Sequence, residues 1–344
     1  MEFKVEKRVL HFKQPAGTSR GVYLTRKIWL VHLHDGDQQG VGECAPLPDL
    51  SCDAMVDERY EVLLSLACEH VCQTGEIDYE TLRDYPSMLF GIETAFLSLQ
   101  AAKQGLAGET LFDTAFSRGE VGIPINGLVW MGNYEEMLQR LEEKLKLGFR
   151  CVKLKIGAID FNKEFDLVKR IREHFSHHEV ELRVDANGGF SFDEALYKLE
   201  LLSQYNIHSI EQPIRQGQWA NMAELCRESP LPIALDEELI GVNDPEMKRH
   251  MLNMIKPRYI ILKPSLHGGM MGCWEWIDIA RDLGVGSWIT SALESNIGLN
   301  AIAQFASSVY SDHITMPQGL GTGQLFTDNI DMPLEIRGDQ LWRS

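Results

Sequence analysis

The chain has 344 residues, of which 44% are hydrophobic and 24% charged. These values are typical of a folded globular protein and exclude disordered, collagen-like and coiled-coil classes. Asp and Glu total 50 against 33 Lys and Arg, a net charge of −17, which argues against nucleic acid or an anionic membrane as a partner. A small anionic substrate stays compatible with this charge, because a local group of basic side chains can oppose it.

Other features of the composition indicate a cytoplasmic protein. No apolar stretch approaches the ~18 residues that a membrane helix needs. The N-terminal stretch carries charges every few residues and lacks the apolar region of a secretory signal. The seven cysteines form no C-x-x-C pair, which favours reduced thiols. The sequence leaves the oligomeric state open.

The first 120 residues predict an α+β unit. Residues 1–33 alternate between apolar and polar as a strand does, and Asp35-Gly36 is a strong hairpin signal before a returning strand at 39–43. Two stretches with helical spacing follow at about 53–72 and 87–104. We expect a three-stranded antiparallel sheet covered by helices.

From residue 121 short apolar runs alternate with helical stretches. The runs that predict strands are Ile123–Val129, Cys151–Ile156, Glu181–Val184, Ser209–Gln212, Ile233–Asp236, Tyr259–Lys263, Ser287–Ser291 and Ile314–Pro317. Eight such units in about 200 residues fit a (β/α)8 barrel. A doubly wound open sheet is the alternative, but it would carry a Gly-rich phosphate turn after its first strand, which Asn126-Gly127-Leu128 is not.

The predicted fold is therefore of the α/β class, a (β/α)8-type barrel with an α+β N-terminal capping domain. We expect the capping domain to span residues 1–120, completed by a C-terminal segment at 325–344. The barrel would span residues 121–324.

Five ionisable residues stand at or near the ends of successive predicted strands: Lys155, Asp185, Glu211, Asp236 and Lys263. Their separations are 30, 26, 25 and 27 residues, each about one strand-helix unit. In a barrel this spacing places all five side chains on the C-terminal rim, facing one central site. Each of these five residues is a weak indication of a site by itself. Together they are a strong indication, because one barrel geometry explains all five positions.

Three of these residues predict a metal site. Asp185, Glu211 and Asp236 would repel one another if they converged unpaired, and a divalent cation would relieve that repulsion. Oxygen ligands without Cys or His suit Mg²⁺, or Mn²⁺, rather than Zn²⁺. For any one of the three, a solvated loop end or a helix cap is the alternative interpretation.

The lysines predict acid/base chemistry. Lys153 and Lys155 are two apart on a strand and share a face, so like-charge crowding should lower the pKa of one and make it a base. Lys263 would come from nearly across the barrel. A cation facing lysines suggests removal of a proton α to a carboxylate through an enediolate. The alternative is that these are surface lysines.

This constellation resembles the enolase superfamily, in which a Lys base and Mg²⁺ act on such substrates. Within it, the chain is similar to the branch of muconate-lactonising enzymes, dipeptide epimerases and o-succinylbenzoate synthases, and most similar to the last family. The motifs that carry the resemblance are Gly40-Val-Gly-Glu-Cys-Ala-Pro-Leu-Pro, Ser291-Ala-Leu-Glu-Ser-Asn-Ile-Gly and Gly321-Thr-Gly-Gln-Leu-Phe-Thr-Asp-Asn-Ile. Ala292 and Asn296 depart from the family's usual Ser-rich pattern.

The resemblance implies a hydro-lyase of menaquinone synthesis, which dehydrates 2-succinyl-6-hydroxy-2,4-cyclohexadiene-1-carboxylate to 2-succinylbenzoate. Lys155 would remove the α-proton and Lys263 would stabilise the intermediate. Residues expected to contact the substrate are Lys153, Asn187, Ser291 and Ser295. Two alternatives stay open: a dipeptide epimerase or N-acylamino acid racemase using the same lysines, and a binding protein with an inactive barrel.

Two further expectations concern the capping domain. The turn-rich segment 14–21 and Ala45–Leu50 should close over the barrel mouth. Arg20 would then meet a substrate carboxylate, or stay solvated as an ordinary loop residue. His32 and His34 share one face of a strand and could chelate a metal, but exposed strand histidines next to a hairpin are the favoured interpretation.

Overall fold

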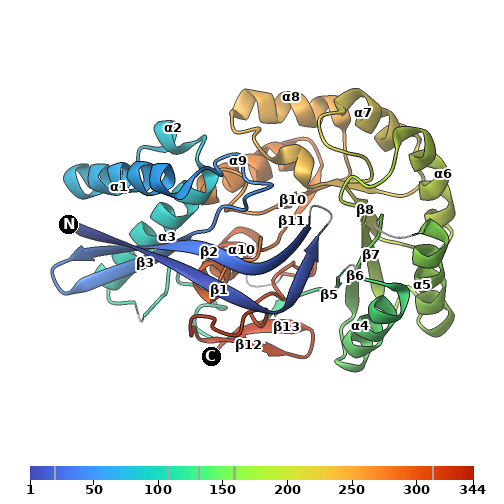
Figure 1. The fold of residues 1–344 in the computed structure, drawn as a ribbon, viewed down its shortest axis with the longest axis horizontal. Coiled ribbons are helices and arrows are strands. Elements are labelled where there is room, and N and C mark those ends of the chain that lie inside the picture. Colours follow the sequence, from blue (N-terminus) through green and yellow to red (C-terminus); the bar gives the residue numbers. More distant parts are fainter. Residues whose placement is uncertain (19–20, 107, 131, 158–159, 312–313) are drawn as a thin grey trace.

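The computed structural model describes the chain except residues 19–20, 107, 131, 158–159 and 312–313. Figure 1 shows a capping domain of sheet and helices beside a barrel whose strands are enclosed by helices. This arrangement confirms the predicted α/β class with an N-terminal capping domain. Within the described residues, no helix is both long and apolar enough to cross a membrane.

The capping domain is built on an antiparallel sheet of order β1-β2-β3, formed by Glu2–Thr18, Gly21–Asp35 and Gln38–Cys44. The predicted Asp-Gly turn joins β2 to β3, with Asp35 opposite Gln38 and Gly36 at a φ of 60°. Three helices follow: α1 (Asp57–Thr74), α2 (Tyr79–Leu82) and α3 (Pro86–Lys103).

Helix α3 lies directly on the backbone of β3. A Cβ atom at Gly42 would stand 1.9 Å from the carbonyl oxygen of Gly91, and one at Gly40 would stand 2.1 Å from that of Ala95. Only glycine permits this close approach of helix and strand. The glycines of the Gly40-Val-Gly motif therefore fix α3 against the sheet.

The barrel contains a seven-stranded parallel sheet in the order β11-β10-β9-β8-β7-β6-β5. Its strands are β5 (Gly127–Val129), β6 (Cys151–Lys155), β7 (Glu181–Asp185), β8 (Ser209–Glu211), β9 (Ile233–Leu235), β10 (Tyr259–Leu262) and β11 (Gly286–Ile289). Most of their apolar side chains form a contiguous core with the surrounding helices, and Ala234, Ile261 and Trp288 form a separate small cluster. Seven of the eight predicted strand positions are thus confirmed.

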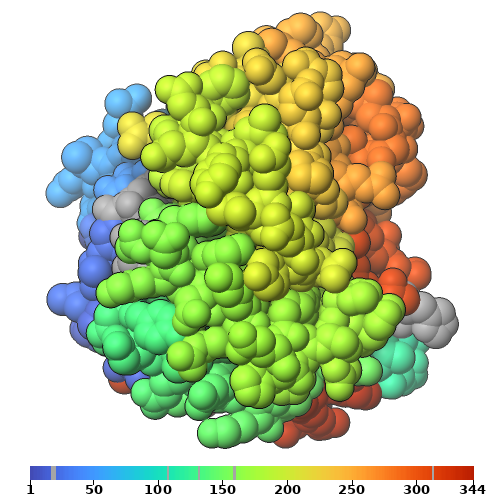
Figure 2. Space-filling view, turned by 90° about the vertical axis from the view of Figure 1, so that its right-hand side faces the viewer, coloured from blue at the N-terminus to red at the C-terminus, as the bar shows by residue number. Residues whose placement is uncertain are grey.

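The barrel helices pack outside the strands, as the green to orange ribbons of Figure 1 show. They are α4 (Tyr134–Lys146), α5 (Phe161–His174), α6 (Phe192–Ser203), α7 (Trp219–Glu228), α8 (Pro245–Ile255), α9 (Gly269–Asp282) and α10 (Asn296–Tyr310), with a short 3₁₀ turn at Glu237–Leu239. Figure 2 shows the outer face, where the green and yellow helices cover the strands and the blue capping domain lies at the left edge.

The prediction of an eighth strand at 314–317 is wrong. Closure of the barrel rests on single bridges two residues later, where Gln318 pairs with Ile125 and Gly319 pairs with Thr290. The physical reason is that Pro317 and Pro124 have no N–H to donate to a ladder at this seam. The barrel is therefore only partly closed by regular strand pairing.

The C-terminal segment contacts both parts of the molecule. The Lys13 amide donates to the Leu325 carbonyl at 2.8 Å, beside β1. The last hairpin, β12 (Leu334–Arg337) and β13 (Gln340–Arg343), instead pairs with β4 (Ile123–Pro124) at the start of the barrel. We propose a domain division near residue 120, with 325–344 shared between the two domains rather than belonging to the capping domain alone.

Candidate active site

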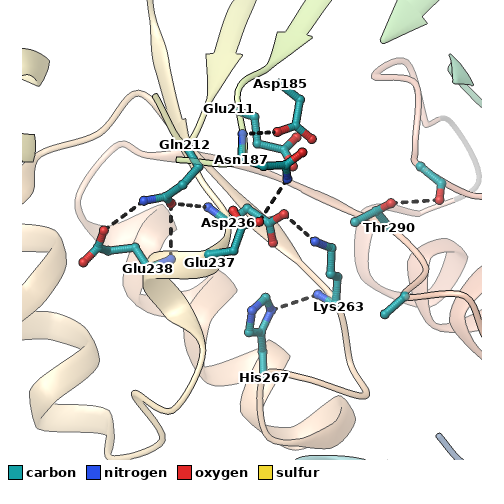
Figure 3. A network of polar contacts seen from close by, with 12 residues as sticks. Asp185, Asn187, Glu211, Gln212, Asp236, Glu237, Glu238, Lys263, His267 and Thr290 are labelled. Carbon is teal, nitrogen blue, oxygen red and sulfur yellow. Dashed lines mark hydrogen bonds and ion pairs between the residues drawn. The ribbon is translucent and has the colours of Figure 1, made fainter. Parts of the chain in front are cut away.

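The strand register places the predicted residues on one rung of the barrel. Lys155 on β6 lies opposite Asp185 on β7, which lies opposite Glu211 on β8. Asp236 follows β9 directly, and Lys263 follows β10 directly. Because parallel strands end at the same edge, all five side chains meet at the C-terminal rim. Figure 3 shows four of them converging from separate strands.

Ion pairs connect the lysines to the carboxylates. The Lys153 Nζ atom lies 2.7 Å from an Asp185 oxygen and 2.6 Å from a Glu211 oxygen. Lys155 Nζ lies 2.7 Å from Asp185, and Lys263 contacts Asp236. The three carboxylates are buried, whereas the lysine side chains keep 13–16% of their surface exposed. The ammonium groups thus lie nearer to solvent than the carboxylates.

The carboxylates differ in how easily they ionise. Burial and the neighbouring Asp185 charge raise the pKa of Glu211 well above its usual range. Burial alone would raise the pKa of Asp185, but Lys153 and Lys155 outweigh it and hold that pKa well below its usual range. For Asp236, Lys263 likewise outweighs burial and lowers the pKa to about 2. Glu211 is therefore the carboxylate whose charge is least compensated.

The pKa of Lys153 is raised rather than lowered. Burial alone would lower it, but the charges of Asp185, Glu211 and Asp236 outweigh that effect. For Lys263 burial is outweighed in the same way, chiefly by Asp236, and its pKa is also raised. The expectation that crowding by a second lysine sets these pKa values does not hold for Lys153, because carboxylates approach it more closely than the other ammonium groups do.

The donor set fits a hard divalent cation, although the carboxylates are not gathered around one point. Within the described residues, no three acid, thiol or imidazole groups form a ready-made cluster for a metal, because the lysines stand between the carboxylates. One buried oxygen of Glu211 and one of Asp236 nevertheless have no hydrogen-bond partner among the described residues. Buried carboxyl oxygens without a partner suit Mg²⁺ or Mn²⁺ as ligands.

A second group of side chains forms hydrogen bonds around the rim. Asn187 accepts a hydrogen bond from Lys155 at 2.8 Å and donates one to Glu237 at 2.9 Å. Gln212 donates to Glu238 at 3.0 Å, and its side-chain oxygen accepts from the amides of Asp236 and Glu238. Sequence reasoning missed Gln212 and Glu237. The signal that could have found them is their position directly after the proposed metal ligands Glu211 and Asp236.

A cavity of about 340 Å³ opens in front of the rim. It is lined by Lys153, Lys155, Lys263, Asn187, Ser291 and also by Gln14, Leu47 and Leu50 of the capping domain. Segments from both domains therefore enclose the same space, in line with the expected position of 14–21 and Ala45–Leu50 over the barrel mouth. Arg20 lies outside the described residues.

The structure separates the two serines that were expected to contact substrate. Ser291 lines the cavity and hydrogen-bonds Thr322 at 2.7 Å. Ser295 is fully buried and is not among the described residues that line the cavity. Its hydroxyl accepts from the Ile297 amide and contacts the buried Glu43, so Ser295 caps α10 and joins the two domains. Its predicted role in substrate binding is not supported.

The two histidines of the capping sheet lie on β2, away from this cavity. His32 is 3.8 Å from the Glu6 carboxylate. Burial lowers the pKa of His32, which keeps the ring neutral. His32 and His34 are half-buried rather than exposed, which differs from the prediction of exposed strand histidines.

Comparisons with known proteins identify the family. Residues 136–340 match the family "Enolase C-terminal domain-like", and residues 19–99 match "MenC, N-terminal domain". The o-succinylbenzoate synthase of Desulfotalea psychrophila is 45% identical, with 99% of this chain and 98% of that protein covered. The chain belongs to the o-succinylbenzoate synthase family of the enolase superfamily.

Solved structures agree with this assignment. The crystal structure of MenC from Desulfotalea psychrophila superimposes with a TM-score of 0.81 at 42% identity, covering 99% of both chains. A dipeptide epimerase from Enterococcus faecalis, complexed with Mg and a dipeptide, gives a TM-score of 0.81 at 19% identity, covering 99% of this chain and 96% of that one. The second likeness shows the shared fold.

Proposed function

We propose that this chain dehydrates 2-succinyl-6-hydroxy-2,4-cyclohexadiene-1-carboxylate to 2-succinylbenzoate, the o-succinylbenzoate synthase step of menaquinone synthesis. The observation that carries the proposal is full-length membership of that family together with a rim on which Lys155 and Lys263 face one cavity. The proposed class of partner is thus a small carboxylate, and the acidic net charge gives no support to nucleic acid or membrane. A cytoplasmic location stays a prediction.

Lys155 is the proposed base and acid. Its Nζ, as the neutral amine, would take the proton α to the ring carboxylate, and the resulting ammonium would return that proton to the departing hydroxyl group, which leaves as water. The C–H and C–O bonds break, one water leaves, and the ring becomes aromatic. Asn187 holds Lys155 through the 2.8 Å hydrogen bond, which orients the ammonium at the cavity wall. One group can serve both steps if proton and hydroxyl leave from the same face.

Lys263 is the proposed electrostatic partner. It follows β10, four strands from β6 in the sheet order, so it faces Lys155 across the barrel. Its raised pKa keeps it charged at neutral pH. A fixed ammonium beside the negative charge left by proton removal lowers the barrier. Lys153, which also lines the cavity, is the proposed contact for the substrate carboxylate.

Asp185, Glu211 and Asp236 are the proposed ligands of Mg²⁺, with Mn²⁺ as the alternative ion. When bound, the ion would supply positive charge that stabilises the ionised substrate carboxylate. The buried, partnerless oxygens of Glu211 and Asp236 support this assignment. The high pKa of Glu211 supports it too, because a neighbouring cation would favour its ionised form.

A substrate panel tests the proposal. The purified protein with Mg²⁺ should remove the diene absorbance of the cyclohexadiene, and EDTA should abolish that activity. Dipeptides and N-succinylamino acids serve as competing substrates, because an epimerase or racemase would use the same two lysines. Epimerisation of dipeptides without dehydration would overturn the proposal in favour of the isomerase, and inactivity towards every substrate would favour a binding protein.

A further inference from the structure

The backbone of Lys263 is tied to the beginning of helix α9. Its amide donates to Nδ1 of His267 at 2.9 Å, a contact visible in Figure 3. Its carbonyl accepts from the amides of Leu266 and His267 at 2.8 and 3.0 Å. Burial lowers the pKa of His267 to about 3, so the ring stays neutral and Nδ1 can accept. Helix α9 starts two residues after His267, and any shift of its first turn therefore reaches Lys263.

The first turn of α9 has no capping side chain of its own. Its N-cap is Gly268, and the cap is supplied from the other domain. The carboxylate of Glu93, in α3 of the capping domain, accepts from the Met270 amide at 2.6 Å and from the Met271 amide at 3.0 Å. These are two of the amides that a helix leaves unpaired at its N-terminus. A buried carboxylate there also complements the helix dipole.

The start of α9 lies very close to α3. A Cβ atom at Gly269 would stand 2.2 Å from Glu93 Oε2 and 2.9 Å from Leu89 Cγ. Gly268 and Gly269 also have φ values of 87° and 69°, which favour glycine. The Gly268-Gly269 pair therefore lets the helix start lie against α3 with the Glu93 carboxylate between them.

We propose that Glu93 is a positioning residue for Lys263, acting across the domain boundary through the first turn of α9. This inference rests on the proposed role of Lys263 in the reaction. If Glu93 no longer holds the first turn, α9 and the loop 264–268 can move, and the Lys263 ammonium moves with them. Lys155 lies inside β6, which pairs with β5 and β7, whereas Lys263 lies one residue beyond the end of β10.

The chain offers a matched control on the same helix. Arg83, in the capping domain, donates to the Glu275 carboxylate at 2.9 Å. Glu275 lies farther along α9, so Arg83→Gln removes an interdomain contact to this helix without touching its first turn. Glu93→Gln keeps side-chain size but offers one acceptor and an amide group where two amides need acceptors. Gly269→Ala is the second test variant, since its methyl group would displace Glu93.

The experiment measures dehydration kinetics and thermal unfolding of the full-length variants. Burial raises the pKa of Glu93 to about 8, so assays at pH 9 keep the carboxylate ionised. Displacing a catalytic group by about 1 Å can cost roughly 10²-fold in rate. We expect Glu93→Gln and Gly269→Ala to lower kcat by about 10- to 100-fold with little change in KM, whereas Arg83→Gln should lower the melting temperature and leave kcat near the wild-type value.

Solvent exchange of the α-proton of N-succinylamino acids separates positioning from general damage. The enantiomer that loses exchange in Lys263→Arg reports on Lys263, and the other reports on Lys155. Glu93→Gln should slow exchange of the first enantiomer and spare the second. Equal slowing of both, or a wild-type kcat in both Glu93→Gln and Gly269→Ala, would overturn the proposal. If the wild-type protein itself shows no dehydration of the cyclohexadiene, the proposed function is overturned instead.

Discussion

The two sides of the rim hold their lysines by different means. Lys153 and Lys155 lie within β6, a strand paired on both edges, and ion pairs to Asp185 fix their ammonium groups. Lys263 lies one residue beyond β10 and contacts Asp236. Its amide also donates to His267, just before α9, and Glu93 of the capping domain accepts from the first turn of that helix. The position of Lys155 is thus set by strand register within the barrel, whereas our proposal gives a contact between domains a part in the position of Lys263.

This difference suggests a division of labour. A base that must remove a proton and return it within a fixed distance is best carried by a rigid strand. A group that contributes charge makes no bond to the reacting atoms, so it can be carried by a loop, provided that the loop is held in place. The capping domain also supplies Gln14, Leu47 and Leu50 to the cavity wall. A movement of the capping domain can therefore shift both Lys263 and the part of the cavity wall formed by Gln14, Leu47 and Leu50.

The largest effect should come from the proposed metal ligands, which serve both sides. Glu211→Gln removes a ligand charge between the two lysine groups, and we expect dehydration to fall to background while the circular dichroism spectrum is retained. Isothermal titration with Mg²⁺ should show weakened binding. Glu228→Gln, an exposed carboxylate at the end of α7, is the control. Full activity of EDTA-treated wild-type protein would contradict the metal assignment.

Removing the charge on the second side should cost less. We expect Lys263→Ala to reduce kcat by about 10²- to 10³-fold, the usual loss when one preorganised electrostatic group is deleted. This variant also leaves the buried Asp236 without the ammonium group of Lys263, so the melting temperature should fall as well. Lys263→Arg, which keeps the charge, should recover part of the rate. If the alanine and arginine variants are equally impaired, the role of Lys263 depends on more than its charge.

Changing the part of the cavity wall that the capping domain contributes should affect the rate less. Leu50→Ala opens the cavity wall contributed by the capping domain, and we expect kcat/KM to fall by about 10-fold because closure over a site excludes water and completes it. Leu66→Ala, on an exposed face of α1, removes the same side chain far from the cavity. Stopped-flow measurement of both variants compares them directly. Equal kinetics would show that Leu50 does not contribute to closure.

The last prediction concerns stability rather than rate. Burial raises the pKa of Glu93 from 4.5 to about 8 in the folded protein, so the folded state holds a proton that the unfolded state releases at lower pH. Stability from this group is present at low pH and is lost as the pH rises through 8. Between pH 6 and 8 the wild type should lose up to about 1.4 kcal/mol per pH unit relative to Glu93→Gln. Urea unfolding of both proteins at the two pH values measures the difference, and parallel losses would contradict it.

Much of the barrel could be predicted because its strands are short apolar runs at regular spacing, and five of the seven, β6 to β10, end in or are followed by a charged residue at the rim. The closing strand could not, since it rests on Gln318, whose side-chain oxygen accepts from the Ile289 amide at 2.7 Å, in place of a ladder. When a side chain takes the place of the backbone as hydrogen-bond acceptor, the sequence shows no alternation of apolar and polar residues that would reveal a strand.

The same distinction applies to the site. Lys155, Asp185 and Glu211 were predictable because strand register alone brings them together. Glu93 was not, because it meets Met270 across 177 residues of sequence, through a contact between domains. The burial of Ser295 was not predictable for a related reason. The motif 291–298 contributes both to the cavity wall and to packing between the domains, and the sequence does not show which of its side chains faces the cavity.

The most direct test of the account is the dehydration rate of Lys155→Arg. Arginine keeps the positive charge and the ion pair with Asp185, but it does not release a proton at neutral pH. If Lys155 is the base held in place by β6, the cyclohexadiene should persist in the presence of this variant and Mg²⁺, while exchange of the Lys263-facing enantiomer of an N-succinylamino acid continues. Dehydration at the wild-type rate would contradict the assignment of Lys155 as the base.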